Sequence, residues 1–358
     1  GVRIGVLGLC YRHTPTVTLA KYVAHLTFED DSATAVRLVP ALAKRSDIVI
    51  GVGHIPAETD STRAARGGDL PRLARGVPGV AAWFGGHSHN LVCDRVAGVP
   101  VMIAGAHGEV VGVCDLVVDP IANRVIDSRF DLVRTWADEV TPDSAMAARV
   151  ERWNAAVAPL AAKRLGANRH ALRRNRGGEG TVGDVVADAM RAASGVDIAL
   201  QNSGGLRADL EEGDITRGAV YEVMPFDNLV FTLGLTGAEV RVALEQALKY
   251  NRVTQVSGIR YTFDSSRPAM DRVLTLTDTR GAPLDSAKVY RVAVNDFMAT
   301  GGDNYDVLSG GRNRENSSVL VRDALEQFIA ERCAKGPLDV SPDGRIQRVG
   351  GRGDGAGD

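Results

Sequence analysis

The 358-residue sequence has no excess of either charge, no long apolar run and few aromatic residues. Its 42 basic residues against 44 acidic ones argue against a protein of nucleic acids or anionic membrane surfaces, because such proteins carry a basic excess. No apolar run approaches the roughly 20 residues that cross a bilayer, and no targeting signal is recognised. The length suits two domains, since single cores stop growing at roughly 250–300 residues.

Cysteine is also scarce, with only Cys10, Cys93, Cys114 and Cys333. None of them forms a C-x-x-C pair, which excludes a zinc ribbon or a thioredoxin motif. Two disulfides and four thiols are both compatible with this spacing. For a chain of this length, we favour four buried thiols that pack as small apolar side chains.

The first 140 residues alternate between strand and helix patterns. Residues 32–44 carry apolar side chains at helical spacing, between apolar runs at 1–9 and 47–52. This β-α-β order predicts a layered α/β domain. Further strands are expected at 79–84, 99–104, 112–118 and 123–132, the last one antiparallel.

A long alanine-rich helix is predicted at 141–165. Thr141 is a suitable N-cap, Pro142 fits the first helical position, and Gly166 would end the helix. Because it separates two α/β regions, we interpret it as an interdomain connector.

The second region opens with a predicted capping box from Thr181 to Asp184, and a second box from Thr236 to Glu239 begins another helix. The alternation of patterns again predicts α/β structure. Strands are expected at 197–200, 230–235, 259–263, 273–277 and 290–294, and a helix at 318–334. The glycine- and aspartate-rich residues 350–358 are expected to fray.

Three histidines follow predicted strands in glycine-rich turns. His54 comes after residues 48–52, and Gly85-Gly-His87-Ser-His89 comes after residues 79–84. Open α/β sheets place their sites at the carboxyl ends of strands, and imidazole is a ligand for zinc, manganese and iron. For His54 alone, a partly buried histidine without a ligand is at least as good an interpretation, whereas metal binding is favoured for the pair. His13, His25 and His170 are expected at the surface. His107, in the turn Ala104-Gly-Ala-His-Gly108, could approach the same face as the three strand-end histidines, but a role without a ligand is favoured for it.

Three loops of the second region are suited to a nucleotide. In Gln201-Asn-Ser-Gly-Gly-Leu-Arg207, two glycines allow close backbone approach and the arginine offers a planar fork for phosphate. Aromatic residues are only 5% of the chain, so Phe226 and Phe297 in polar loops are candidates for stacking on a base. Taken singly, each phenylalanine is more often a core residue and Arg207 a surface residue.

These segments together resemble the 5′-nucleotidase family of dinuclear metallophosphoesterases, which includes UDP-sugar hydrolases and 2′,3′-cyclic-nucleotide phosphodiesterases. Residues 1–140 resemble the later part of the metallophosphoesterase domain, and residues 166–349 resemble the family's C-terminal domain. The motifs in the C-terminal domain are Asn202-Ser-Gly-Gly-Leu-Arg207, Gly213-Asp-Ile-Thr216, Met224-Pro-Phe-Asp-Asn228, Leu235-Thr-Gly237 and Gly301-Gly-Asp-Asn-Tyr305. The implied fold is a partial metallophosphoesterase β-sandwich with flanking helices, a linker helix at 141–165, a mixed-sheet α/β nucleotide-binding domain and a tail at 350–358.

The resemblance also implies roles for individual residues. His54 and His87 would bind one of two divalent metal ions, such as zinc or manganese, and His89 would bind the other. On the substrate, Phe226 and Phe297 would sandwich the base, Asn202 and Asn228 would meet the base or ribose, Asp303 would accept from ribose hydroxyls, and Arg207 and Arg176 would hold phosphate. Arg173 and Arg174 compete with Arg176 for this last role.

The sequence departs from the family pattern at the metal site. It contains no Asp-x-His and no Asn-His, so the remaining metal ligands and the catalytic histidine are expected upstream of residue 1. The metal site is therefore expected to be incomplete in this chain, and no catalytic residue is identified. A chain that truly starts at residue 1 is expected to be a weak or inactive phosphatase.

The function implied for the full protein is hydrolysis of nucleoside 5′-monophosphates to nucleoside and phosphate by a metal-activated hydroxide. UDP-sugars and 2′,3′-cyclic nucleotides remain alternative substrates, and a sulfur-oxidation hydrolase is a lesser alternative. A different class of function is a non-catalytic nucleotide-binding remnant. The resemblance also implies a periplasmic, cell-surface or secreted location.

Overall fold

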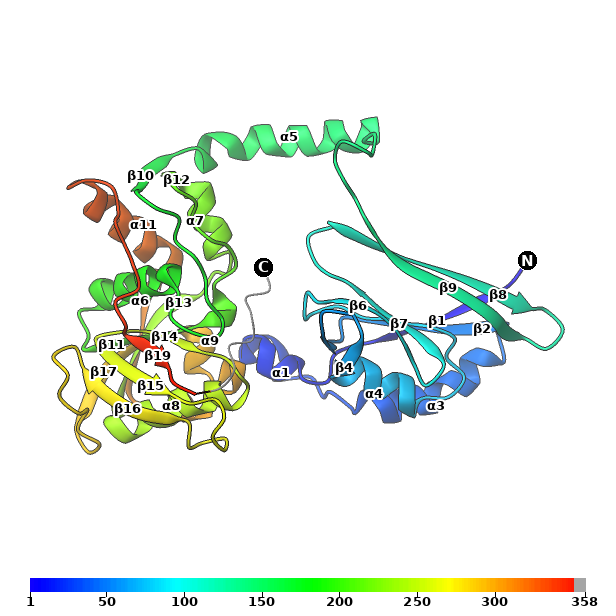
Figure 1. Ribbon diagram of the computed structural model, residues 1–358, viewed down its shortest axis with the longest axis horizontal. Helices are drawn as coiled ribbons and strands as arrows, with labels where there is room; N and C mark the ends of the chain where they lie inside the picture. The colour runs from blue at the N-terminus through cyan, green and yellow to red at the C-terminus, as the bar shows by residue number, and fades with distance from the viewer. Residues whose placement is uncertain (351–358) are drawn as a thin grey trace. The chain divides into compact units, whose positions relative to one another are not determined.

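The computed structural model describes residues 1–350 and divides into two compact units, each with helices packed on β-sheets (Figure 1). The first unit contains residues 1–15 and 24–147, and the second contains residues 16–23 and the chain from residue 148 onward. The predicted α/β class is confirmed. The tail predicted at 350–358 lies, apart from Gly350, outside the described residues.

The first unit is built on a five-stranded sheet in the order β1-β2-β5-β7-β6, in which only the edge strand β6 is antiparallel. Its strands are β1 (Ile4–Leu9), β2 (Ile48–Gly53), β5 (Trp83–Phe84), β7 (Val99–Ala104) and β6 (Leu91–Val96). Helices α3 (Asp31–Ala43) and α4 (Asp69–Gly76) pack on one face through Val39, Leu70 and Leu73. The strand expected at 79–84 is shorter, because Gly79 has φ 83° and keeps the chain in a turn.

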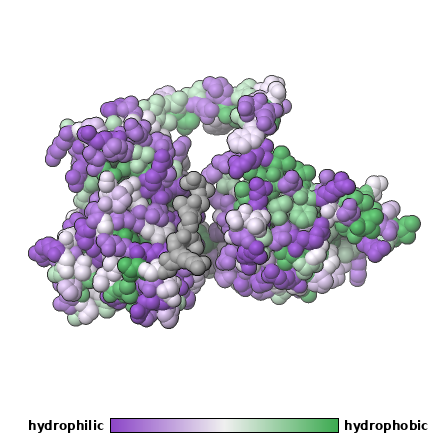
Figure 2. Space-filling view, viewed as in Figure 1, coloured by the Kyte–Doolittle hydropathy of each residue, from purple (hydrophilic) through white to green (hydrophobic). Residues whose placement is uncertain are grey.

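A long hairpin of β8 (Val110–Asp119) and β9 (Arg124–Arg134) packs on the opposite face of this sheet. Val110 and Leu132 contact Met102 of β7 there. The outward side of the hairpin is exposed, and apolar side chains, including Val117 and Ile121, gather near its tip (Figure 2). The first unit also contains β3 (Glu58–Thr59) and β4 (Ala65–Gly67). Helix α2 (Ala20–Val23) belongs to the second unit, and α1 (Thr14–Val17) begins in the first unit and ends in the second.

Gly51 of β2 provides a test of packing in this core. A Cβ atom at Gly51 would lie 2.2 Å from the ring of Trp83, whose side chain is almost fully buried. We expect Gly51→Ala to lower the free energy of unfolding of the first unit by about 1–3 kcal/mol, because the ring has no space to yield. Urea titrations followed by tryptophan fluorescence measure this change. Gly8→Ala on β1 is the matched control, since a Cβ there meets nothing within 4 Å.

The predicted helix at 141–165 is observed as α5 (Ser144–Ala161), but both of its predicted ends are wrong. Asp143, not Thr141, accepts a hydrogen bond from the first turn, from the Met146 backbone nitrogen at 2.8 Å. The chain leaves the helix before Gly166 because β10 (Arg164–Asn168) pairs with β12 (Gly213–Thr216). None of the residues of α5 is buried.

The second unit contains a five-stranded mixed sheet in the order β14-β11-β17-β13-β18. Its strands are β14 (Thr254–Ser257), β11 (Ile198–Asn202), β17 (Val289–Asn295), β13 (Leu229–Thr236) and β18 (Arg312–Leu320). Helices α6 (Thr181–Ser194) and α11 (Val321–Cys333) pack on one face. Helix α8 (Gly237–Lys249) packs on the other face, between this sheet and a smaller sheet of β16 (Val273–Asp278), β15 (Ile259–Phe263) and β19 (Ile346–Arg348).

Short elements complete the second unit. They are the helices α7 (Arg217–Val223), α9 (Asp296–Ala299) and α10 (Asp306–Ser309), and the 3₁₀ turns η1 (Ser203–Gly205) and η2 (Gly302–Asn304). Within residues 1–350, no helix has the length and apolarity that crossing a membrane requires.

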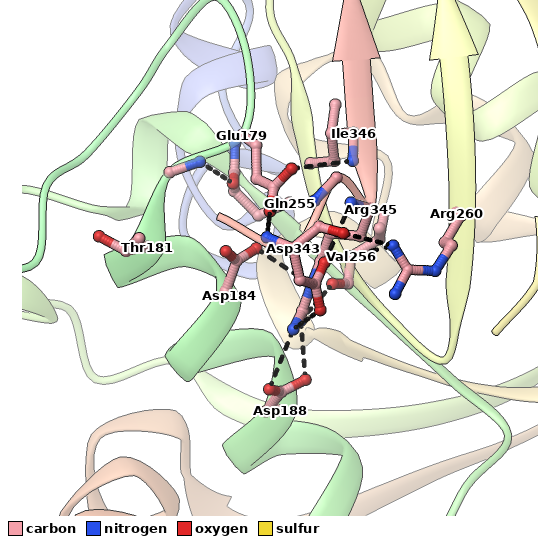
Figure 3. Close-up of polar contacts among 12 residues, drawn as sticks. Glu179, Thr181, Asp184, Asp188, Gln255, Val256, Arg260, Asp343, Arg345 and Ile346 are labelled. Atoms are coloured by element: carbon pink, nitrogen blue, oxygen red, sulfur yellow. Dashed lines mark hydrogen bonds and ion pairs between the residues drawn. The ribbon is translucent and has the colours of Figure 1, made fainter. Parts of the chain in front are cut away.

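The two predicted capping boxes have different outcomes. The box at Thr236 and Glu239 is confirmed, with both reciprocal hydrogen bonds present. The box at Thr181 and Asp184 is wrong, because Gly180 is the N-cap and Thr181 already lies inside α6. Asp184 is instead buried on the core side of the helix, beside Arg345, which also binds Asp188 (Figure 3).

All four cysteines are free thiols, which agrees with the favoured alternative of no disulfide. The expectation that all of them are buried is wrong. Cys10 is exposed and the other three are half-buried.

Candidate functional site

The sheet of the second unit brings the candidate loops to one edge. Strands β11 and β17 are parallel and end at Asn202 and Asn295, whereas β13 is antiparallel to β17 and begins at that same edge. The loops that carry Asn202, Asn228 and Phe297 therefore lie at a common edge. The turn before β14 also reaches it, because Thr254 is paired with Asn202.

A network of amide and carboxylate groups forms the base of this site. Asn202 is buried, and its Nδ2 donates to Asp303 Oδ2 at 2.7 Å. Its Oδ1 accepts from Asn295 Nδ2 at 2.9 Å. Arg252 Nη1 donates to Asp303 Oδ1 at 2.7 Å. The side-chain amide of Asn202 is thus hydrogen-bonded within the protein, and its bond to Asp303 fixes the position of that carboxylate.

Asn228 has a similar internal contact at the start of β13. Its Nδ2 donates to Asp296 Oδ1 at 2.8 Å, and the Leu229 backbone nitrogen donates to the same oxygen at 3.2 Å. These bonds join the loop before β13 to the helix α9 that follows β17. Because Phe226 and Phe297 lie within two residues of this contact, it fixes the backbone from which both rings project.

The two phenylalanines differ in exposure. Phe226 is 46% exposed, and the guanidinium carbon of Arg207 lies 5.9 Å from its ring centroid. Phe297 is half-buried, and its ring lies over Gly302, where a Cβ atom would be 2.4 Å away. Gly302 is therefore required, because a side chain at this position would displace the Phe297 ring.

Four arginines lie close enough to influence one another at this edge. Burial lowers the pKa of Arg176, and the guanidinium groups of Arg207, Arg174 and Arg252 lower it further. Burial also lowers the pKa of Arg207, with a further contribution from Arg174, while Asp303 acts in the opposite direction.

Carboxylates compensate only some of these arginines. Arg174 is paired with Asp209 at 3.0 Å, and Arg252 is paired with Asp303. Among residues 1–350, Arg176 and Arg207 make no ion pair with a carboxylate, and Arg207 donates only to the Gly204 carbonyl, at 3.3 Å. The half-buried guanidinium of Arg207 and the exposed one of Arg176 are thus available to an anion, because their positive charge is uncompensated.

In the first unit, the strand-end histidines form two pairs. The rings of His54 and His87 have centroids 5.2 Å apart, and those of His89 and His107 are 5.7 Å apart. His87 and His89 both have positive φ, at 68° and 58°. His107 is exposed and lies beside His89, so it does approach the face of the strand-end histidines. The sequence feature that indicates this position is the turn Ala104-Gly-Ala-His-Gly108, which follows β7 in the same way that the turns of His54 and His87 follow β2 and β5.

The described part of the chain does not fit a complete metal centre. It contains no group of three or more histidine, cysteine, aspartate or glutamate side chains that could hold a metal ion. Imidazoles are suitable donors, but zinc in proteins has at least three protein ligands. The roles of His54, His87 and His89 as ligands therefore remain predictions, and no reaction step is derived through a metal.

Sequence comparison identifies the second unit. Residues 156–310 match the 5′-nucleotidase C-terminal domain. The trifunctional nucleotide phosphoesterase protein YfkN of Bacillus subtilis is 29% identical over 377 residues, covering 98% of this chain and 25% of that protein. A 5′-nucleotidase of Diplobatis ommata is 27% identical, covering 92% of this chain and 63% of that protein. The chain thus spans between a quarter and two thirds of the length of these curated relatives.

The fold leads to the same group of proteins. The crystal structure of a 5′-nucleotidase precursor from Thermus thermophilus superposes with a TM-score of 0.84 at 29% identity, covering 98% of this chain and 73% of that one. Residues 156–310 are thus similar to the 5′-nucleotidase C-terminal domain, and along nearly its whole length the chain is similar to 5′-nucleotidases.

Proposed function

We propose that this chain supplies the nucleotide-binding part of a phosphoesterase that hydrolyses nucleoside 5′-monophosphates. One observation carries the proposal. At a single edge of the second unit's sheet, two guanidinium groups without carboxylate partners, Arg176 and Arg207, lie with an exposed phenylalanine and an anchored carboxylate. This combination matches the three parts of a nucleotide, which are a dianionic phosphate, a planar base and a hydroxylated sugar.

Each residue has a definite part in the proposal. Arg176 and Arg207 bind phosphate oxygens through charge-assisted hydrogen bonds. Phe226 and Phe297 stack on the base, and Asp303 accepts hydrogen bonds from the ribose. Asn202 and Asn228 act mainly by fixing Asp303 and the phenylalanine loops, since their side chains bind Asp303 and Asp296. Binding of this kind orients the phosphate ester for attack and excludes water from the base.

Hydrolysis is proposed for the whole protein, with two divalent metal ions as cofactors and His54, His87 and His89 among their ligands. Metal ions would supply an activated hydroxide and neutralise charge on the phosphate. UDP-sugars and 2′,3′-cyclic nucleotides are further candidate substrates. A location outside the cytoplasm is supported by a relative named as a cell wall protein of Listeria monocytogenes, which is 24% identical over 92% of this chain.

The test is binding of AMP to the full chain, measured by isothermal titration calorimetry. Phe226→Ala and Phe297→Ala are each expected to weaken AMP binding about 5- to 100-fold, because stacking on an aromatic ring contributes about 1–3 kcal/mol per base. Ribose 5-phosphate, which has no base, should bind the parent and the variants equally.

Phe328→Ala is the matched control. Phe328 is also a partly buried phenylalanine with an arginine over its ring, Arg332 at 5.0 Å, but it lies on α11, away from the candidate site. If the parent fails to bind AMP, or if all three phenylalanine variants lose affinity to the same extent, the proposed base-binding role is wrong.

A further inference from the structure

Asp303 is held by two side chains that come from distant parts of the second unit. Arg252 lies between α8 and β14, and Asn202 ends β11, yet each donates to one carboxylate oxygen at 2.7 Å. The side chain of Asp303 is only 10% exposed, and its backbone φ is 54°. A left-handed conformation costs free energy for any residue except glycine. The two hydrogen bonds fix the orientation of the carboxylate on this backbone.

A second contact fixes the two segments that carry this pair. Tyr305 lies two residues after Asp303, and Thr254 lies two residues after Arg252. Their side chains are buried, and Tyr305 Oη and Thr254 Oγ1 are 2.7 Å apart. On the other side, Arg252 is tied to the end of α8, because its backbone nitrogen donates to the Ala247 carbonyl at 3.1 Å. The ion pair between Arg252 and Asp303 thus joins two anchored backbone segments.

This arrangement leaves acceptor capacity on Asp303. A carboxylate has about four lone-pair positions. Arg252 and Asn202 occupy one on each oxygen, so each oxygen can accept one more hydrogen bond. Two neighbouring acceptors suit two neighbouring hydroxyl groups, as in the cis-diol of ribose. A phosphate group is excluded from this position, because its charge would be repelled by the carboxylate.

We propose that Arg252 is a positioning residue that presents Asp303 to the ribose diol, so that the site selects ribonucleotides over nucleotides without the diol. The inference rests on the proposed function of this site. Arg252 compensates the charge of a buried carboxylate, and its hydrogen bond on Oδ1 orients the remaining lone pairs. Without it, Asp303 retains only its bond from Asn202, and its side chain is free to rotate toward other donors.

The experiment compares adenosine with 2′,3′-dideoxyadenosine, using calorimetric titration of the full chain. These probes have no phosphate, so Arg176 and Arg207 do not affect the comparison directly. The parent chain is expected to prefer adenosine about 10- to 100-fold, since a site that binds hydroxyl groups through a charged acceptor rejects the analogue without them. In Arg252→Ala, this preference is expected to fall below about threefold, and Arg252→Lys should restore part of it.

Arg312→Ala is the matched control. Arg312 is likewise a half-exposed arginine paired with a carboxylate, Glu239 at 2.6 Å, but it lies at the opposite end of β13. It should retain the parent preference. Circular dichroism spectra verify that each variant is folded.

The outcomes separate this inference from the proposed function. If Arg252→Ala binds both nucleosides more weakly but keeps the parent preference, Arg252 is merely structural and the inference is overturned. A parent that binds both nucleosides equally also overturns it, while base binding stands. A parent that binds neither nucleoside overturns the proposed function and this inference together.

Discussion

Replacing both Arg176 and Arg207 with alanine is expected to weaken AMP binding about 100- to 10,000-fold, with adenosine binding nearly unchanged. Hydrogen bonds to charged groups contribute about 1.5–3 kcal/mol each, so losing two of them costs about 3–6 kcal/mol. The structure gives a reason for a large effect. Burial lowers the pKa of both side chains, and neither is paired with a carboxylate in residues 1–350. A bound phosphate would therefore be their principal charge partner.

The measurement is calorimetric titration of parent and variants with AMP and adenosine at two salt concentrations. AMP affinity of the parent should fall as salt rises, and that dependence should become much weaker in the double variant. Arg173→Ala is the matched control, because Arg173 lies in the same loop but is paired with Glu211 and Asp209. Equal losses for AMP and adenosine would show that the double variant disturbs the fold rather than a phosphate site, and the assignment would then be rejected.

Most helices and strands of the chain could be predicted from local patterns. Residues 259–263 are a strand with the predicted limits, and the capping box at Thr236 and Glu239 is present. Both signals are local, because alternation and capping depend on residues a few positions apart. The end of α5 was predicted wrongly for the opposite reason. Leu165 continues a helical pattern, but pairing of its strand with residues 213–216 decides its conformation.

The candidate site shows the same division. Phe226, Phe297 and Arg207 could be found because they stand in motifs with glycine or proline. Arg252 could not, since it stands in no motif and its partner Asp303 is 51 residues away. Likewise, Arg173, Arg174 and Arg176 are all candidates for phosphate binding from the sequence alone. The structure distinguishes them by their partners, because Arg173 and Arg174 are paired with acids that lie 35–38 residues further along the chain.

Asp184→Asn is expected to stabilise the second unit at neutral pH. Neither carboxylate oxygen of Asp184 accepts a hydrogen bond in the described structure, although Arg345 Nε lies 3.4 Å from Oδ1 (Figure 3). The pKa of Asp184 is raised from 3.8 to about 7, chiefly by burial, with smaller contributions from Glu179, Asp343 and Asp188, and only Arg345 opposes the rise. The acid is thus protonated more readily in the folded protein than in the unfolded chain.

The direction of the pH effect follows from linkage. Below about pH 3, Asp184 is protonated in both states and costs no stability. As the pH rises from about 4 to about 7, the unfolded chain loses this proton first, so the free energy of unfolding falls by about 2–4 kcal/mol. Asparagine has nearly the same shape but does not titrate. The variant should therefore match the parent near pH 3 and exceed it by about 2–4 kcal/mol at pH 8, which corresponds to about 4–16 °C in the midpoint of thermal unfolding.

Calorimetric unfolding at pH 5 and pH 8, together with hydrogen exchange of peptides from α6, measures this difference in the unit that carries Asp184. Asp188→Asn is the matched control, since Asp188 is one turn away, is partly exposed and binds Arg345 Nη1 at 2.9 Å. It should weaken the attachment of Arg345 and destabilise the unit without gaining stability at high pH.

If Asp184→Asn and the parent lose stability equally between pH 5 and pH 8, a group other than Asp184 causes the pH dependence, and the prediction is wrong. A uniform loss at both pH values would instead mean that the carboxylate of Asp184 is needed to hold Arg345, and that its ion pair outweighs the cost of its burial.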